Sequence, residues 1–298
     1  MLEYLDTADI VRIFMVSGCR GGNSVNKKIK VMKKVVKRGR PSKKSIVSSK
    51  LISTWRPELV KMDNVEFNKD LFVPMPTGKK IDDLLSSEGG LMKGTNFAFI
   101  GDPGVGKTTV ILDVLADLQA KGQKVLFISG EMNSIDMHGY VRRFPKFGQV
   151  PILFLGDYIE KDPMVVLKSV LTEGFDVVMI DSMAEVCVNI VDFHGGTNKN
   201  AESQVLNVLE KHNKGGNKAE LNTTFLIIQQ VTKAGTFAGS NRFKHMLTGM
   251  ARMQFVEGGR CISFSKNRRG GQMDRLFFKV DTTKDVSWLH TEANNTEH

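Results

Sequence analysis

The residues best suited to chemistry lie in one short segment of the 298-residue chain. An apolar run, Phe97 to Ile100, leads into the pattern G-x-x-x-x-G-K-T, which ends at Thr108. Glycines let backbone N–H groups close around phosphate oxygens, and a following helix adds the positive end of its dipole. The pattern therefore predicts a loop that binds the phosphates of a nucleotide. Its residues are Gly101, Asp102, Pro103, Gly104, Val105, Gly106, Lys107, Thr108 and Thr109.

The surroundings of this loop fit a nucleotide site better than they fit a simple glycine-rich turn. The apolar run before the loop suits a buried strand, and apolar residues recur at helical spacing between Ile111 and Leu118. In such a P-loop, the side chain of Lys107 reaches the β- and γ-phosphates, and the hydroxyl of Thr108 binds Mg²⁺. We therefore predict ATP and Mg²⁺ as the ligands. The alternative is a turn that merely precedes an ordinary helix.

Apolar runs alternate with helical segments along the rest of the chain. This alternation predicts an α/β fold with a mostly parallel, twisted sheet flanked by helices and with its ligand at the carboxyl ends of the strands. A glycine- and asparagine-rich loop is expected at 195–200, and a long polar loop and a helix before residue 261. Further strands are expected at 124–129, 152–155, 177–182, 224–230 and 261–265, and helices at 163–171 and 203–211.

Three polar residues follow expected strands and belong to the same prediction. Hydrolysis of a nucleoside triphosphate needs a metal ligand, a group that orients the attacking water and a group that contacts the γ-phosphate. Asp181 fits the first role, Glu131 the second and Gln230 the third. The structural alternatives are an aspartate that begins a loop and a glutamine that caps a strand.

The basic excess of the chain is confined to its first fifty residues. Residues 1–50 hold 13 of the 42 Lys and Arg residues and 3 of the 32 Asp and Glu residues, so the rest of the chain is balanced at 29 of each sign. Single-sign segments of this kind are usually disordered and often bind nucleic acid. We predict a flexible basic arm at 1–50 that binds nucleic acid, a linker at 51–70 and an ATPase domain at 71–298.

The centre of the arm carries a short R-G-R-P sequence. Arg38 and Arg40 flank a glycine, as in the AT-hook, a peptide that lies in the minor groove of A·T-rich DNA. This similarity predicts contact with duplex DNA through Arg38 and Arg40. The alternative is a generic basic tail that binds phosphates without regard to sequence.

Cysteine and hydropathy patterns indicate a cytoplasmic protein. Cys19, Cys187 and Cys261 are far apart in the sequence, which argues against a disulfide framework or a zinc ribbon. No apolar run approaches the length of about 18 residues that a membrane span needs. Charged residues also interrupt the start of the chain, so neither a signal peptide nor a membrane partner is expected.

Several motifs together resemble the RecA-like ATPase core of the bacterial RadA (Sms) proteins. They cover about residues 70–280 and occur in the same order as in that family. The DnaB-type hexameric helicases are similar in the Glu-Met after the second strand and in the K-x-R sequence near the end. The motifs are T-G-x-x-x-D-x-L from Thr77, G-G-L-x-x-G from Gly89, S-G-E-M from Ser129, I-D-S from Ile180, V-T-K-A-G from Val231, H-M at His245 and K-N-R-x-G from Lys266.

The resemblance implies further roles. RadA-like proteins are ring-shaped motors that move on single-stranded DNA during recombination, repair or replication, so it implies a homo-oligomer, expected as a hexameric ring, and single-stranded DNA as partner. In DnaB-like rings the K-x-R pair reaches the neighbouring subunit's nucleotide, which maps to Lys266 and Arg268. The loop of Lys233 would contact DNA in the central channel, and residues 195–200 would form a second channel loop.

The chain also departs from the family pattern. RadA-like proteins begin with a four-cysteine zinc motif and end with a Lon-protease-like domain, and neither pattern occurs here. A core of this kind would suit a phage or plasmid protein of recombination or replication, acting in the cytoplasm of a bacterium or an infected host. Two alternatives stay open. One is a strand-annealing or recombinase-type filament protein with weak ATPase activity, and the other is a KaiC-like regulatory ATPase.

Overall fold

The computed structural model describes residues 56–231, 237–271, 275–280 and 285–289. The chain divides into two units, Met1–Asn64 and Val65–His298, with the boundary inside the expected linker. In the first unit, a 3₁₀ turn η1 at Met62–Asn64 is described. The basic arm with Arg38 and Arg40, and Lys233 in the second unit, lie outside the described residues. Within the described ranges, no helix combines the length and apolar character needed to span a membrane.

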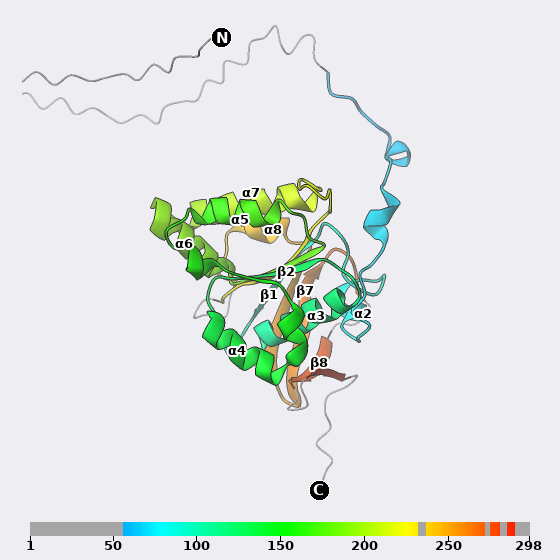
Figure 1. The fold of residues 1–298 in the computed structure, drawn as a ribbon. Helices are drawn as coiled ribbons and strands as arrows, with labels where there is room; N and C mark the ends of the chain where they lie inside the picture. Colours follow the sequence, from blue (N-terminus) through cyan, green and yellow to red (C-terminus); the bar gives the residue numbers. More distant parts are fainter. Residues whose placement is uncertain (1–55, 232–236, 272–274, 281–284, 290–298) are drawn as a thin grey trace, which may run out of the picture. The chain divides into compact units, whose positions relative to one another are not determined.

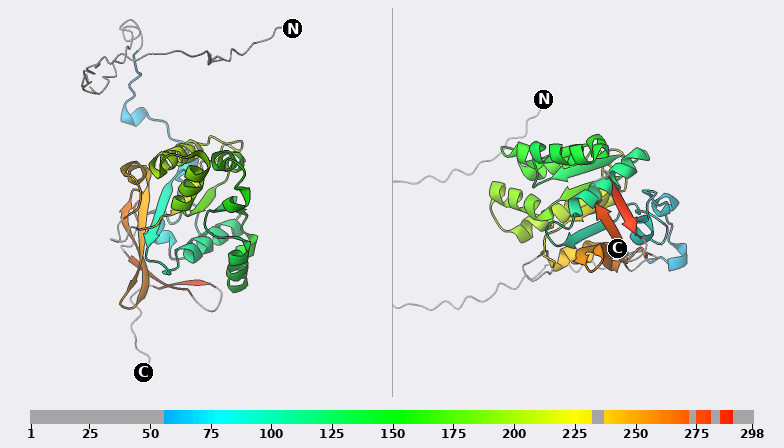
Figure 2. Two further views of the ribbon diagram at one scale, coloured as in Figure 1. Left: turned by 90° about the vertical axis from the view of Figure 1, so that its left-hand side faces the viewer. Right: turned by 90° about the horizontal axis from the view of Figure 1, so that it is seen from below.

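The second unit is built on a sheet whose described strands follow the order β3-β2-β4-β5-β1-β6-β7-β8-β9. The six strands from β3 to β6 are parallel, and β7, β8 and β9 continue the sheet antiparallel, coloured orange to red in Figure 2. The strands are β1 Asn96–Gly101, β2 Val125–Ser129, β3 Ile152–Phe154, β4 Val177–Asp181, β5 Thr224–Ile228, β6 Gly249–Val256, β7 Gly259–Asn267, β8 Arg275–Val280 and β9 Val286–Leu289.

Helices cover both faces of the sheet (Figure 1). The helix after the P-loop, α3, packs with the α4 region on one face, and α5, α6, α7 and α8 lie on the other. The α-helices are α2 Asp82–Leu85, α3 Lys107–Ala120, α4 Ser134–Arg143, α5 Pro163–Leu171, α6 Met183–His194, α7 Asn198–Asn213 and α8 Asn241–Met246. Short 3₁₀ helices are η2 Lys69–Phe72, η3 Pro145–Gln149 and η4 Leu155–Tyr158.

The central strand β1 shows why this sequence forms a doubly covered sheet. Successive side chains of a strand point to opposite faces. Phe97 and Phe99 therefore pack in the α3-side core, whereas Ala98 and Ile100 pack in the core under α5 to α7. All six residues of β1 are buried, as expected for a parallel strand with helices on both faces.

The predicted fold class is confirmed, and α5 begins and ends where the sequence predicted. The expected loop at 195–200 is wrong in extent, because Thr197 accepts a hydrogen bond from the backbone N–H of Asn200 (3.3 Å) and starts α7 one turn early. The long polar loop expected before residue 261 is also wrong in part, because β6, Gly249–Val256, lies within it. Six of the described α-helices and strands were not predicted: α2, α4, α6, β6, β8 and β9.

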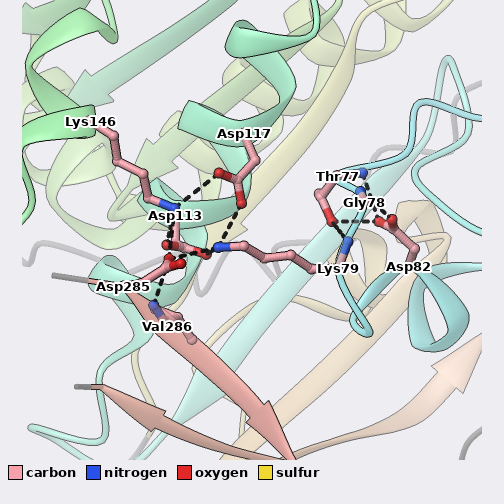
Figure 3. Close-up of polar contacts among 9 residues, drawn as sticks. All are labelled: Thr77, Gly78, Lys79, Asp82, Asp113, Asp117, Lys146, Asp285 and Val286. Carbon is pink, nitrogen blue, oxygen red and sulfur yellow. Dashed lines mark hydrogen bonds and ion pairs between the residues drawn. The ribbon is translucent and has the colours of Figure 1, made fainter. Parts of the chain in front are cut away.

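A charged cluster joins α3 to distant parts of the chain (Figure 3). The ammonium of Lys79 lies 2.7 Å from the carboxylate of Asp113, and 2.8 Å from both Asp117 and Asp285. Lys146 contacts the same three carboxylates. Because the Asp113 side chain has no exposed surface, this cluster compensates a fully buried charge on α3.

The electrostatics of the cluster follow from this burial. Burial raises the pKa of Asp113 to about 6, against the pull of the two ammonium groups. Burial also acts to lower the pKa of Lys79, but its hydrogen bonds to three carboxylates more than reverse the effect, so its pKa lies above the ordinary value. For Asp285, the two lysines outweigh burial and hold its pKa below the ordinary value.

The turn before α2 holds Lys79 in place, which gives the T-G-x-x-x-D motif a structural role. The carboxylate of Asp82 accepts hydrogen bonds from the Thr77 hydroxyl (2.8 Å) and from the backbone N–H groups of Thr77 (2.9 Å) and Gly78 (2.7 Å). Gly78 has φ +80°, a conformation that disfavours other residues. The folded turn thereby presents the next residue, Lys79, to α3 (Figure 3).

We predict that Lys79→Ala destabilises the protein far more than Lys80→Ala does. Removing Lys79 leaves the buried Asp113 with Lys146 alone, a loss of roughly 2–3 kcal/mol. Lys80 forms a partly exposed pair with Asp83 (3.0 Å), and its removal costs less than about 1 kcal/mol. The free energy of unfolding from denaturant titration measures both changes. Equal losses for the two variants would contradict the structural role of the cluster.

Candidate nucleotide-binding site

Parallel pairing brings the ends of four strands to one edge of the sheet. Ser129 of β2 lies beside Asp181 of β4, which lies beside Ile228 of β5, and β5 pairs with β1 immediately before the P-loop. A pocket of about 360 Å³ opens at this edge. The structure thus brings together residues that are more than 120 positions apart in sequence. Its lining includes Gly101, Pro103, Gly104, Lys107, Thr108, Glu131, Asp181, Gln230 and Val231.

The backbone of the loop requires its glycines. Gly104 and Gly106 have φ values of +74° and +102°, in the region that favours glycine. A Cβ on Gly101 would collide with the backbone carbonyl of Met253 on β6. Gly106 caps α3 without a side-chain hydrogen bond, so the first N–H groups of the helix stay available to an anion.

Lys107 lies across this loop. Its ammonium donates hydrogen bonds to the carbonyls of Gly101 and Asp102, both at 2.9 Å. Burial lowers its pKa, while the charges of Asp181, Asp102 and Glu131 act to raise it. The cation is therefore held over the phosphate-binding loop, inside the pocket.

Thr108 and Asp181 form the direct link between the P-loop helix and β4. The Thr108 hydroxyl donates a 2.6 Å hydrogen bond to the Asp181 carboxylate, which is 4% exposed. Burial raises the pKa of Asp181 to about 6; Glu131 adds to the rise, and the Thr108 hydrogen bond and Lys107 oppose it. A hydroxyl beside a carboxylate is a donor set that suits Mg²⁺, which commonly binds one or two carboxylates together with substrate phosphates. Within the described ranges, no group of three or more His, Cys, Asp or Glu residues forms a metal site without such phosphates.

The two glutamines after β5 differ in their surroundings. Gln229 is buried, and its amide donates to the backbone carbonyl of Ala238. Gln230 is exposed and lines the pocket, as Glu131 does. The structure therefore places the side chain of Gln230, and not that of Gln229, where a γ-phosphate contact is possible.

Tyr140 of α4 is a site residue that the sequence did not reveal. Burial raises the pKa of its phenol, and the charge of Asp181 adds to the rise. Hydrogen bonds to Thr109 and Thr108 act in the opposite direction. The phenol therefore lies beside the Thr108–Asp181 pair. No spacing in the sequence indicates this, because α4 itself was not predicted.

The hairpin of β6 and β7 supplies a second unpredicted group. Phe255 and Arg260 are cross-strand partners, and the guanidinium lies 5.4 Å from the centroid of the ring. A guanidinium nitrogen of Arg260 lies 3.7 Å from where a Cβ on Gly106 would be. Among the described residues, Arg260 has no carboxylate partner within 4.0 Å, and Phe255 is 52% exposed. A cation and an exposed ring thus lie beside the positive end of α3.

Lys266 and Arg268 lie at the opposite edge of the sheet from the pocket. Lys266 belongs to β7, which extends beyond the strand expected at 261–265, and Arg268 follows the end of β7. The Arg268 backbone N–H donates to Thr248, whose own N–H donates to Asn96 at the start of β1. The two side chains share a target, as expected for alternate residues, since they donate to the carbonyls of Lys244 (2.7 Å) and His245 (3.3 Å) in α8. They contribute nothing to the pocket of their own subunit.

The fold and the pocket define a RecA-like fold with a P-loop. A KaiC-like protein from Pyrococcus horikoshii OT3 covers 73% of this chain at 15% identity, with a TM-score of 0.53 over 99% of that protein. The flagellar accessory protein FlaH from Methanocaldococcus jannaschii covers 72% of the chain at 10% identity, with a TM-score of 0.55 over 96% of that protein. At these identities the similarity concerns the fold alone.

Sequence similarity points to the RadA proteins. The DNA repair protein RadA of Aquifex aeolicus is 26% identical over 197 residues, which are 64% of this chain and 41% of that protein. RadA of Listeria monocytogenes is 29% identical over 214 residues, which are 70% of this chain and 43% of that protein. No family model matches the chain. The resemblance of this core to the RecA-like core of RadA is confirmed, and the chain spans about two fifths of the length of these relatives.

Proposed function

We propose that this core binds and hydrolyses Mg²⁺·ATP and couples hydrolysis to single-stranded DNA in repair, recombination or replication. The observation that carries the ATPase proposal is the Thr108–Asp181 hydrogen bond, because it places a hydroxyl and a carboxylate side by side next to Lys107. The DNA proposal is supported by similarity to proteins described as DNA repair proteins.

In the proposed mechanism each pocket residue has one task. Thr108 and Asp181 would hold Mg²⁺, whose charge would offset that of the phosphates. The ammonium of Lys107 gives up its hydrogen bonds to the loop carbonyls and binds the β- and γ-phosphates instead. Glu131 accepts a proton from the attacking water, and Gln230 contacts the γ-phosphate and transmits its presence to the segment that follows.

The position of the γ-phosphate implies where the nucleoside lies. Glu131, Asp181 and Gln230 are on the β2-β4-β5 side of β1, so the ribose and base extend toward β6 and β7. Arg260 and Phe255 lie on that side, and they offer a cation and a planar ring to the base. We assign them to the nucleoside part of the site.

The central test compares Glu131→Gln with Lys107→Ala. Glu131→Gln loses only water activation, so kcat falls by roughly 10²–10⁴ while affinity for ATP stays within about twofold. Lys107→Ala loses hydrolysis and affinity together, because it removes the cation on the phosphates. Steady-state ATPase assays and nucleotide titrations separate the two patterns. Glu160→Gln, on the exposed segment before α5, is the matched control and keeps the parental rate. Hydrolysis by Glu131→Gln at the parental rate would assign water activation to another residue.

We further propose that Lys266 and Arg268 act on the nucleotide of a neighbouring subunit in a hexameric ring. Their place at the sheet edge opposite the pocket supports this proposal, because it leaves no role for them in the pocket of the same subunit. The alternative is that they only hold the end of α8, whose last carbonyls accept their hydrogen bonds. Channel contacts of Lys233 with single-stranded DNA, and of Arg38 and Arg40 with duplex DNA, belong to the same proposal.

Mixed assemblies of two inactive variants test the contribution in trans. Arg268→Ala subunits keep an intact P-loop, and Lys107→Ala subunits keep an intact Arg268. A finger in trans is worth about 10³–10⁵ in rate, so each variant is nearly inactive alone. Co-assembled, they are expected to recover part of the ATPase activity. Confirmed co-assembly without recovery would exclude the trans role, and full activity of Arg268→Ala would leave only the α8 contact.

A further inference from the structure

A groove between α5 and α7 lies away from the nucleotide pocket, on the helical face drawn uppermost in Figure 1. It encloses about 290 Å³ and is lined by Lys168 and Thr172 from the α5 segment and by Lys211 and His212 from α7. The neighbouring residue Asn213 exchanges hydrogen bonds with Asn96 at the start of β1, whereas the P-loop follows the end of β1. The Lys211 end of the groove therefore lies at the sheet edge opposite the pocket.

His212 is a buried polar group that the fold does not satisfy. It is 2% exposed, and its Nδ1 has no hydrogen-bond partner among the described residues. Burial lowers its pKa, and the charge of Lys211 lowers it further. Leaving a buried polar atom without a partner costs about 1–3 kcal/mol. The imidazole lines the hollow, and a ligand there would relieve this cost once a small movement of the ring opened Nδ1, which is closed to solvent in this structure.

Among the described residues, the lysines of the groove also lack an ionic partner, unlike two lysines close to them in the sequence. Lys214 pairs with Glu210 (2.8 Å), and Lys218 pairs with Glu173 (2.6 Å). Lys168 and Lys211 are exposed, and neither has a carboxylate within 4.0 Å in the described part of the chain. Two uncompensated ammonium groups therefore flank the buried imidazole.

The groove continues into a second, more open hollow of about 640 Å³ that shares Thr172 and Lys211. Lys214 and Lys218, each paired with a glutamate, line this continuation together with the carboxylate of Glu220. A single small anion would occupy a fraction of the two hollows. An extended polyanion would follow the lysines from one hollow into the other.

We propose that this groove binds the phosphodiester backbone of single-stranded nucleic acid, with Lys168 and Lys211 as phosphate contacts and His212 as a hydrogen-bonding partner. Lysines that contact phosphates release counterions, which favours binding without sequence preference. The groove would hold the strand on an outer face, separately from any contact in a ring channel. The choice of nucleic acid as the polyanion rests on the proposed function; the geometry of the groove does not.

The double variant Lys168→Gln/Lys211→Gln tests this proposal in the full chain. The binding of a labelled single-stranded oligonucleotide is followed by fluorescence anisotropy over a range of salt concentrations. Loss of two phosphate contacts is expected to lower the slope of log K against log salt by about 1.4, since each contact contributes about 0.7 on single strands. The matched control is Lys121→Gln/Lys279→Gln, which removes two exposed lysines that also lack a carboxylate within 4.0 Å among the described residues. A slope change that is absent, or equal in the two variants, would overturn the proposal.

Two further readouts keep this result independent of the nucleotide site. ATPase activity without DNA is expected to stay at the parental level in both variants, so loss of this activity would point to damage of the fold. The ring signals of His212 in NMR spectra are expected to shift on addition of the oligonucleotide but not of inorganic phosphate at the same phosphate concentration. A shift with inorganic phosphate alone would identify a small-anion site and overturn the assignment to nucleic acid.

Discussion

The hydrogen bond between Thr108 and Asp181 depends on the parallel order of the central strands. Thr108 is the second residue of α3, the helix after β1, and Asp181 ends β4, two strands away across β5. Only a register that aligns the carboxyl ends of these strands brings the two side chains within 2.6 Å. The same alignment places Glu131 and Gln230 at the pocket. The role proposed for each of these residues depends on its position at this edge of the sheet.

Ion pairs around a buried carboxylate hold α3, the helix that follows the P-loop, in its place. Asp113 lies inside α3, and its carboxylate is compensated by lysines from the turn before α2 and from η3. A carboxylate without such partners would be costly in this core. The cluster also includes Asp285, which precedes β9, so it ties the end of the sheet to the helix that begins at Lys107. Ion pairs at Asp113 therefore fix the position of α3, and the hydrogen bond from Thr108 to Asp181 fixes its phosphate-binding end.

The sequence predicted those parts of the site that local spacing determines. The G-x-x-x-x-G-K-T spacing and the polar residues after apolar runs identified the P-loop, Asp181, Glu131 and Gln230. Tyr140, Arg260 and the Asp113 cluster were missed. Their positions depend on contacts between segments that are distant in the sequence, and no short spacing of residues predicts such contacts. The strand β6 was missed for a related reason, since its Arg252 and Gln254 interrupt the apolar run that marks a buried strand. Lys266 and Arg268 were recognised as a pair, but only the antiparallel course of β7 shows that they lie at the edge away from the pocket.

The central claim is that the Thr108–Asp181 pair is a metal site that acts together with a bound nucleotide. Isothermal titration of the unaltered chain with a non-hydrolysable ATP analogue, with Mg²⁺ and with a chelator in its place, tests this claim most directly. One nucleotide is expected to bind per chain, with a marked loss of affinity for the analogue when Mg²⁺ is removed. Equal affinity in the two conditions would contradict the metal site, and the absence of binding in both would contradict the nucleotide site itself.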